Sequence, residues 1–182
     1  FIQPPKAQSA DETIPTLCDR VENATLIGDR RSAILGLKSF SREYRETVVA
    51  LGLKPLLSTL RRDYVDESSV KAILETLLIL FIRGDGSNDL TRSWISEQSR
   101  LQNGKYPSPL VMKQEMETVD QFSLWIADAI TQSEELVHLL IQLLETGNFH
   151  VRLYTIQILE ALVATRPSRA RKSITSLPTG VS

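Results

Sequence analysis

The chain repeats one helix–turn–helix pattern, and this repetition constrains its fold more than any other feature. Lys71 comes at the start of a long apolar run over 73–82, and Arg152 holds the same place before a run over 153–163. In both copies a shorter apolar run and a polar turn come first. Self-similarity on this scale is typical of α-solenoids, which commonly serve as binding surfaces. We therefore expect an all-α, armadillo/HEAT-like α-solenoid of helical repeats, as a right-handed superhelical fragment.

The spacing of the basic residues agrees with such repeats. Arg31 precedes Lys71 by 71 − 31 = 40 residues, inside the armadillo and HEAT period of about 40–47. Arg152 follows Lys71 after 152 − 71 = 81 residues, about two such periods. Between the two units, residues 84–109 have turn formers at both ends and weak periodicity. This favours an insertion loop there, although a degenerate unit would also fit the spacing.

The other domain boundaries follow from composition. Residues 1–12 carry Pro4 and Pro5 among polar residues and predict a flexible leader. The armadillo-like head fragment is expected over 13–182, with 168–182 as the start of an incomplete repeat. Because the chain begins without Met and has no terminating pattern at its end, we expect it to be part of a longer protein.

Capping and breaking residues predict where the helices begin and end. We expect Asp29 and Asn148 to act as N-caps, and Gly52 to end a short helix in the left-handed conformation. Arg166-Pro167 should stop the last long helix. An apolar segment over 53–60 should pack against the helix that Gly52 ends. The expected helices cover about 13–26, 29–41, 42–51, 67–83, 121–130, 134–145, 149–165 and 168–177, with 110–118 helical at best in part.

Composition argues against several classes of function. A net charge of −1 gives no global attraction to nucleic acid or anionic lipid. The longest apolar run, Leu77–Ile82, is far shorter than the roughly 18 residues that a membrane span needs. The single cysteine cannot form an intrachain disulfide. Cys18 shares a helical face with Ile14 and Val21, which predicts a buried, inert thiol.

Catalytic and metal-binding patterns are incomplete. Glu135 and His138 have the Glu-x-x-His spacing of di-iron bundles, but the second copy that such sites need is missing, so we expect His138 on the solvated surface. Residues 85–96 begin like a calcium loop, yet Leu90 and Ser96 stand where Gly and Glu are required. The chain also lacks a phosphate-binding loop and a nucleophile elbow. We therefore expect no enzyme activity, no cofactor and no metal.

Two sets of residues on the long helices could carry function. Arg31, Lys71 and Arg152 share one register, where a tie to a carbonyl or an acid between helices is favoured over contact with a partner. The opposite stripe is small and polar and would line the concave face of an armadillo stack, a common site of protein binding, although a solvated face without a partner would look the same. The candidate protein-binding residues are Ser32, Ser39, Ser69, Thr76, Arg83, His150, Gln157 and Glu160.

Several segments resemble one family over almost the whole chain. They are 17–21 (Leu-Cys-Asp-Arg-Val), 29–31 (Asp-Arg-Arg), 149–152 (Phe-His-Val-Arg) and 176–182 (Ser-Leu-Pro-Thr-Gly-Val-Ser). In these segments the chain resembles the N-terminal globular head of the general vesicular transport factor family, which are long coiled-coil tethers of vesicles in transport between the endoplasmic reticulum and the Golgi.

The resemblance implies a function and partners. It implies a non-enzymatic scaffold that acts in ER-to-Golgi and intra-Golgi transport, in the cytoplasm and peripherally on Golgi and vesicle membranes. The implied partners are a Rab-type small GTPase and SNARE proteins, and the implied full-length state is a homodimer formed through a coiled coil that this chain lacks. The alternative is another armadillo adaptor, such as a nuclear-import receptor. Such receptors carry Trp and Asn ladders on their long helices, whereas Trp94 and Trp125 lie elsewhere here.

Overall fold

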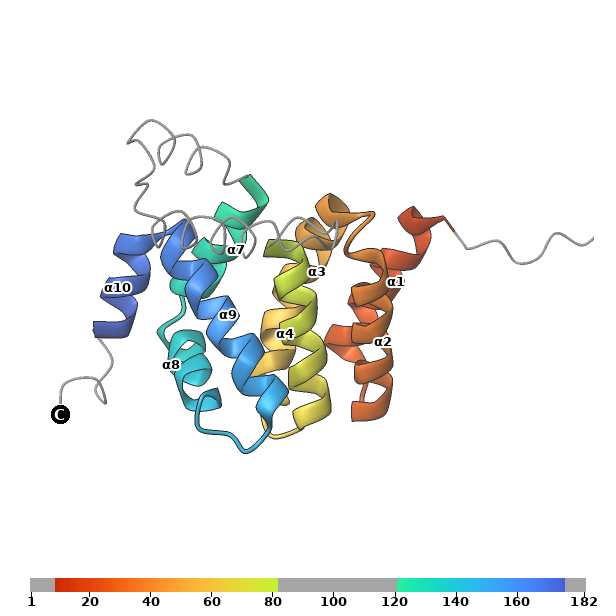
Figure 1. The fold of residues 1–182 in the computed structure, drawn as a ribbon. Coiled ribbons are helices and arrows are strands. Elements are labelled where there is room, and N and C mark those ends of the chain that lie inside the picture. The colour runs from red at the N-terminus through yellow and green to blue at the C-terminus, as the bar shows by residue number, and fades with distance from the viewer. Residues whose placement is uncertain (1–8, 82–120, 176–182) are drawn as a thin grey trace, which may run out of the picture.

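The computed structural model describes residues 9–81 and 121–175, with side chains as far as Lys172. Arg83, the expected insertion at 84–109 and the segment 110–118 lie outside these ranges, as do most of the expected leader and the last seven residues. The described residues form helices and no strand (Figure 1). The helices are α1 (Ala10–Asn23), α2 (Ile27–Phe40), α3 (Arg45–Arg62), α4 (Glu67–Phe81), α7 (Gln121–Thr131), α8 (Glu134–Leu143), α9 (Phe149–Thr165) and α10 (Pro167–Thr175).

The helices stack in the manner of a solenoid. The long helices α2, α4 and α9 lie side by side in one layer, and α1, α3, α7 and α8 lie behind them (Figure 1). α4 occupies the middle of the front layer and packs against both α2 and α9. α10 follows α9 and packs against α7, α8 and α9. The expectation of an all-α solenoid is therefore confirmed.

One continuous apolar core joins the two layers. In α1 the buried residues Ile14, Cys18 and Val21 recur at helical spacing, and the front helices contribute Ile34, Ile73 and Ile158, among others. Fully burying one such aliphatic side chain contributes about 1.5–3 kcal/mol. Because the core runs from α1 to α10, each helix is held mainly by its neighbours in the stack.

The expected break at Gly52 is wrong. α3 runs unbroken from Arg45 to Arg62 and contains both Gly52 and Pro55, so the short helix and the following apolar segment are one element. A Cβ atom at position 52 would lie 3.5 Å from Sγ of Cys18 and 3.6 Å from Cδ1 of Leu37. Position 52 therefore lies in the packed interior, where a β-carbon would touch side chains of α1 and α2 at ordinary van der Waals distance. A local capping rule does not detect such an environment.

Gly52→Ala is expected to stabilise the protein by about 0.5–1 kcal/mol, because glycine costs that much relative to alanine inside a helix and the added methyl meets only ordinary van der Waals contacts. The midpoint of urea unfolding would measure the change. A left-handed backbone at this position would give the opposite sign, with a loss of about 1–2 kcal/mol.

Two helices begin earlier than expected. α1 starts at Ala10 rather than at 13, so 10–12 of the expected leader are helical, and the acidic residues in its first turn suit the positive end of the helix dipole. α2 starts at Ile27, after an N-cap residue, Leu26, whose side chain makes no capping hydrogen bond. Asp29 is therefore not the N-cap and lies inside the first turn.

The boundaries set by strong local signals are confirmed. Asn148 precedes α9, and its Oδ1 accepts a 3.1 Å hydrogen bond from the backbone N–H of Val151. α9 ends at Thr165, directly before Arg166-Pro167. Asp66 has the same role before α4, because its Oδ2 accepts the N–H of Ser69 at 3.1 Å. Two of the long helices thus begin with the same kind of cap.

Candidate functional site

The outer surface of the long helices is the first candidate site. On α4 the side chains that are not buried are those of Glu67, Ser68, Lys71, Glu75 and Ile79, most of them four residues apart. These residues form one solvent-facing stripe along the middle helix. We call this stripe, together with the exposed or half-buried residues that flank it on α2 and α9, the long-helix face. The flanking residues are Leu35 and Lys38 of α2 and His150, Leu153, Tyr154 and Gln157 of α9.

Side chains from all three long helices meet on this face. Nζ of Lys38 donates to Oε2 of Glu75 at 2.6 Å and so joins α2 to α4. Burial raises the pKa of the Tyr154 hydroxyl, and the nearby Glu75 carboxylate adds to that rise while Lys38 opposes it. The ring of His150 lies 6.2 Å from that of Tyr154. The face is therefore a mixture of aromatic and charged groups.

The predicted stripe of binding residues is only partly on the surface. Ser32, Ser39, His150 and Glu160 are exposed and Gln157 is half-buried, but Ser69 and Thr76 are fully buried, which corrects the prediction for those two. Arg83 lies outside the described residues.

The physical reason is the central place of α4. Neighbours on both sides and behind cover every face of this helix except one. Oγ1 of Thr76 donates to the backbone oxygen of Ala72 at 2.7 Å, which satisfies the buried hydroxyl. Small side chains such as Ser69 and Thr76 lie where helices approach each other. The residues of α4 that face solvent, such as Ser68 and Glu75, each come one position before a predicted residue.

Lys38, Glu75 and Tyr154 were missed as members of the face. Lys38 and Glu75 carry opposite charges 75 − 38 = 37 residues apart, close to one repeat period of about 40. Opposite charges one period apart on successive long helices could have revealed the pair. For Tyr154 we find no comparable signal in the sequence.

Of the three basic residues in one register, Arg31 makes the predicted tie between helices, whereas Arg152 bonds to the turn before its own helix. Nη2 of Arg31 donates to Oδ2 of Asp66 at 2.8 Å, which links α2 to the start of α4. Nη1 of Arg152 donates to the backbone oxygen of Thr146 at 3.1 Å, in the turn before α9. Lys71 instead lies half-buried on the long-helix face.

The Asp66 tie predicts a dependence of stability on pH. Hydrogen bonds, first from the Ser69 hydroxyl and then from Arg31, lower the pKa of Asp66 against some desolvation. The unfolded state therefore takes up the proton first as pH falls. Asp66 stabilises the fold above the usual aspartate pKa of about 4, and this stabilisation is lost as pH falls through its lower native value.

Urea unfolding of the unmodified chain and of Asp66→Asn, from about pH 6 down to about pH 2.5, would test this dependence. The difference in unfolding free energy should be largest at the upper end of that range and should shrink toward the acid end. A difference that stays constant over the whole range would contradict it.

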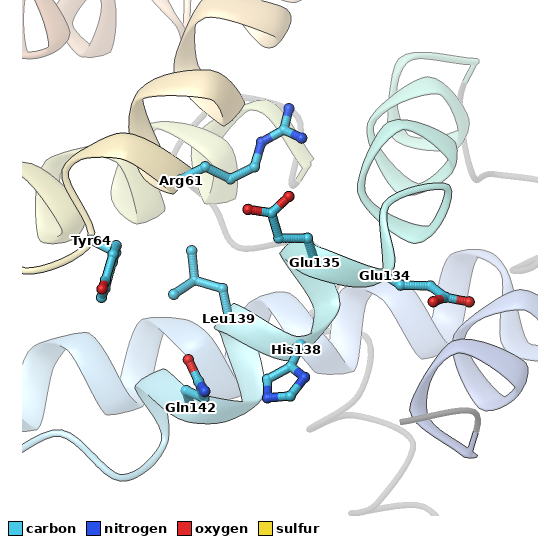
Figure 2. Close-up of a pocket in the computed structure, with 7 residues that line it drawn as sticks. All are labelled: Arg61, Tyr64, Glu134, Glu135, His138, Leu139 and Gln142. Carbon is cyan, nitrogen blue, oxygen red and sulfur yellow. The ribbon is translucent and has the colours of Figure 1, made fainter. Parts of the chain in front are cut away.

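A cavity between two helices of the rear layer is the second candidate site. It has a volume of about 310 Å³ and lies between the end of α3 and the outer side of α8. Figure 2 shows Leu139 in the middle, Tyr64 on one side, and the Glu135 carboxylate extending toward Arg61. His138, expected on the solvated surface, is half-buried and lines this cavity. The complete lining is Arg61, Tyr64, Glu134, Glu135, His138, Leu139 and Gln142.

No group of three or more His, Cys, Asp or Glu side chains in the part of the chain that the structure describes could hold a metal ion. None of the described helices is long and apolar enough to cross a bilayer.

Known proteins with names that refer to protein or vesicle transport are similar to this chain. The chain is 76% identical over all 182 residues to the intracellular protein transport protein USO1 of Saccharomyces cerevisiae. It is 32% identical over 171 residues to the human general vesicular transport factor p115. A crystal structure of Uso1 superposes with a TM-score of 0.80 at 75% identity, over 99% of this chain. Over the region it covers, the chain belongs to the general vesicular transport factor family.

The region of similarity is a small part of those proteins. This chain spans 10% of the yeast USO1 protein, 16% of human p115 and 26% of the solved Uso1 chain, and it matches their N-terminal part. The family resemblance expected from segments such as 149–152 is thereby confirmed. No family model matches the chain.

Proposed function

We propose that this chain is the head portion of a vesicle-tethering factor and works as a non-enzymatic protein-interaction scaffold in ER-to-Golgi and intra-Golgi transport. The observation that carries the proposal is the 76% identity, over the whole chain, to a protein named for intracellular protein transport. At that identity over the whole chain, a shared role is the simplest inference.

The physical chemistry of the described side chains supports a scaffold. The charged groups that are most buried hold helices together, as Arg30 and Asp63 do through hydrogen bonds of 2.7 and 2.8 Å. Burial raises the pKa of the Cys18 thiol to about 11, with Glu22 adding to the effect. Such a thiol stays protonated near neutral pH and is a poor nucleophile. These groups serve structure rather than reaction.

The proposed partners are a Rab-type small GTPase and SNARE proteins, which would bring the protein to Golgi and vesicle membranes from the cytoplasm. The proposed full-length state is a homodimer joined by a coiled coil outside this chain. We place partner contact on the long-helix face, because solenoids commonly bind along such surfaces and this one presents aromatic and charged groups together.

A chimera in yeast would test the transport role. The matched N-terminal segment of USO1 is replaced by this chain, and delivery of a secretory cargo from the ER to the Golgi is followed by the processing of its glycans. We expect delivery to match that of a control in which the yeast segment itself is reinserted. Accumulation of cargo in the ER with the chimera, at equal protein level, would contradict the proposal.

A matched pair of variants in that chimera would test the surface. Leu153→Asp adds a charge to the long-helix face, and Leu51→Asp adds the same charge to α3, at a leucine that is similarly exposed (37% and 45%). We expect Leu153→Asp, but not Leu51→Asp, to reduce cargo delivery. The same variant should also reduce the retention of GTP-loaded Rab-type GTPase on the immobilised protein. Equal effects of the two variants would argue against this face as the contact.

A further inference from the structure

The cavity between α3 and α8 has more negative than positive charge. Two acidic residues line it, Glu134 and Glu135, against the single basic residue Arg61. α8 itself carries these two acids and no Lys or Arg. Within the described part of the chain no cation forms an ion pair with Glu134 or Glu135, whereas Asp63, for example, is paired. The cavity therefore favours a cation from outside.

The same cavity also has an apolar wall. Leu139 is 8% exposed at its centre, and the Tyr64 ring is 52% exposed at its rim. Val65, the next residue, is 79% exposed, which is unusually high for a branched apolar side chain. An exposed apolar ring at the rim of a hollow, with another exposed apolar residue next to it in the chain, is typical of contact sites. A ligand that matched this cavity would thus be apolar along part of its length and positive at its end.

Arginine and lysine side chains have that form. Their aliphatic stems cover apolar surface while the charged head stays near water or a carboxylate. Here the stem would lie on Leu139, an arginine head could stack on the Tyr64 ring, and Glu135 would accept its hydrogen bonds. Arg61 stands on the far side of Glu135 and would repel a second cation, so one basic residue fits better than two.

We propose that this cavity binds one basic side chain from a short segment of a protein partner, with a neighbouring apolar residue of that segment covering Tyr64 and Val65. Acidic segments, nucleic acids and anionic membranes would meet the carboxylates of α8 and are disfavoured. The site lies behind the front layer of helices and is separate from the long-helix face, so the inference goes beyond the proposed transport role.

Two synthetic peptides serve as probes. One is the capped hexapeptide Gly-Leu-Arg-Ser-Leu-Gly, and the other has Glu in place of Arg. Titration of the isotope-labelled chain with each is followed by NMR. We expect the basic peptide alone to bind, with its largest amide shifts in α8 around Glu135 and Leu139, and to bind more weakly as salt is raised. Binding of both peptides, or shifts centred elsewhere, would overturn the proposal.

Charge reversal sharpens the test. Each exposed ion pair is weak on its own, so both acids are changed together. Glu134→Lys with Glu135→Lys should lower the affinity for the basic peptide at least about fivefold and should let the acidic peptide bind. The matched control is Asp11→Lys with Glu12→Lys, which makes the same charge change at exposed positions in the first turn of α1. If the control weakens the basic peptide as much, general attraction explains the binding and the site is ruled out.

Tyr64→Ser tests the apolar wall without changing charge. Tyr64 is half-exposed, so its removal should leave the helical circular dichroism unchanged while weakening the basic peptide about threefold to tenfold. Unchanged affinity would show that the ring takes no part and would overturn this geometry. Because these are binding measurements in solution, their failure leaves the transport test in yeast standing.

Discussion

Replacing Asp63 with alanine is expected to destabilise the fold by about 3–5 kcal/mol, because it strands a buried guanidinium without its counter-ion. Arg30 and Asp63 are only 8% and 5% exposed. Nε and Nη2 of Arg30 donate to the two carboxylate oxygens, and Nη1 donates to the backbone oxygens of Ala24 and Thr25 at 2.9 and 3.2 Å. The hydrogen bond to Asp63 also raises the pKa of Arg30, so the cation remains charged.

The matched control is Glu75→Ala, which breaks an ion pair of similar length in a more exposed place. Lys38 and Glu75 have side chains that are 33% and 20% exposed, so the loss should be at most about 1 kcal/mol. Urea unfolding followed by circular dichroism would measure both. If Asp63→Ala proves unfolded, Asp63→Asn keeps the shape and should still cost more than Glu75→Ala. Equal costs for the two sites would contradict the assigned burial.

The burial of Arg30 is predictable from the sequence, although the repeat spacing points to its neighbour. Arg31 lies one repeat period before Lys71. Arg30 shares a helical face with Ile34 and Leu37, at successive spacings of four and three positions, and that face is the buried one. A basic residue in register with an apolar face indicates a buried, paired charge. Repeat spacing indicates Arg31, whereas the helical face indicates Arg30, and Arg30 is the buried residue.

Local signals predicted some elements to the residue. α9 has the expected bounds because Asn148 caps it and Arg166-Pro167 stops it, and both effects act within a few residues. The continuity of α3 through Gly52 could not be predicted in this way. Two of the side chains that surround position 52, those of Cys18 and Leu37, come from other helices, so the continuity of α3 depends on tertiary packing.

The candidate sites were harder to predict than the fold. Because α4 is apolar or small on most of its circumference, its sequence does not say which narrow stripe meets solvent, and the predicted register was off by one. The cavity joins Arg61 to Glu135, which are 135 − 61 = 74 residues apart. Only the stacking of α8 against the end of α3 brings them together.

The second large effect is expected at Ile158. Ile158→Ala should cost about 2–5 kcal/mol, since the side chain is fully buried and its loss leaves a cavity. Ile156, on the same helix, is 45% exposed, and Ile156→Ala should change stability by less than about 0.5 kcal/mol. Both substitutions raise the intrinsic helix propensity equally, so the difference between the two urea midpoints isolates burial. Equal losses would mean that another surface covers Ile156.

Coverage of Ile156 by another surface would show how the next repeat packs against α9. Phe149, Ile156 and Val163 recur seven residues apart along α9 and are all exposed, at 62%, 45% and 47%. In a solenoid, an apolar stripe of this kind on a long helix is what the next repeat covers. The solved Uso1 chain is about four times as long as the region matched here, because that region is 26% of it. In a chain of that length, Ile156→Ala should approach the cost of Ile158→Ala, while Ile158→Ala keeps its own cost.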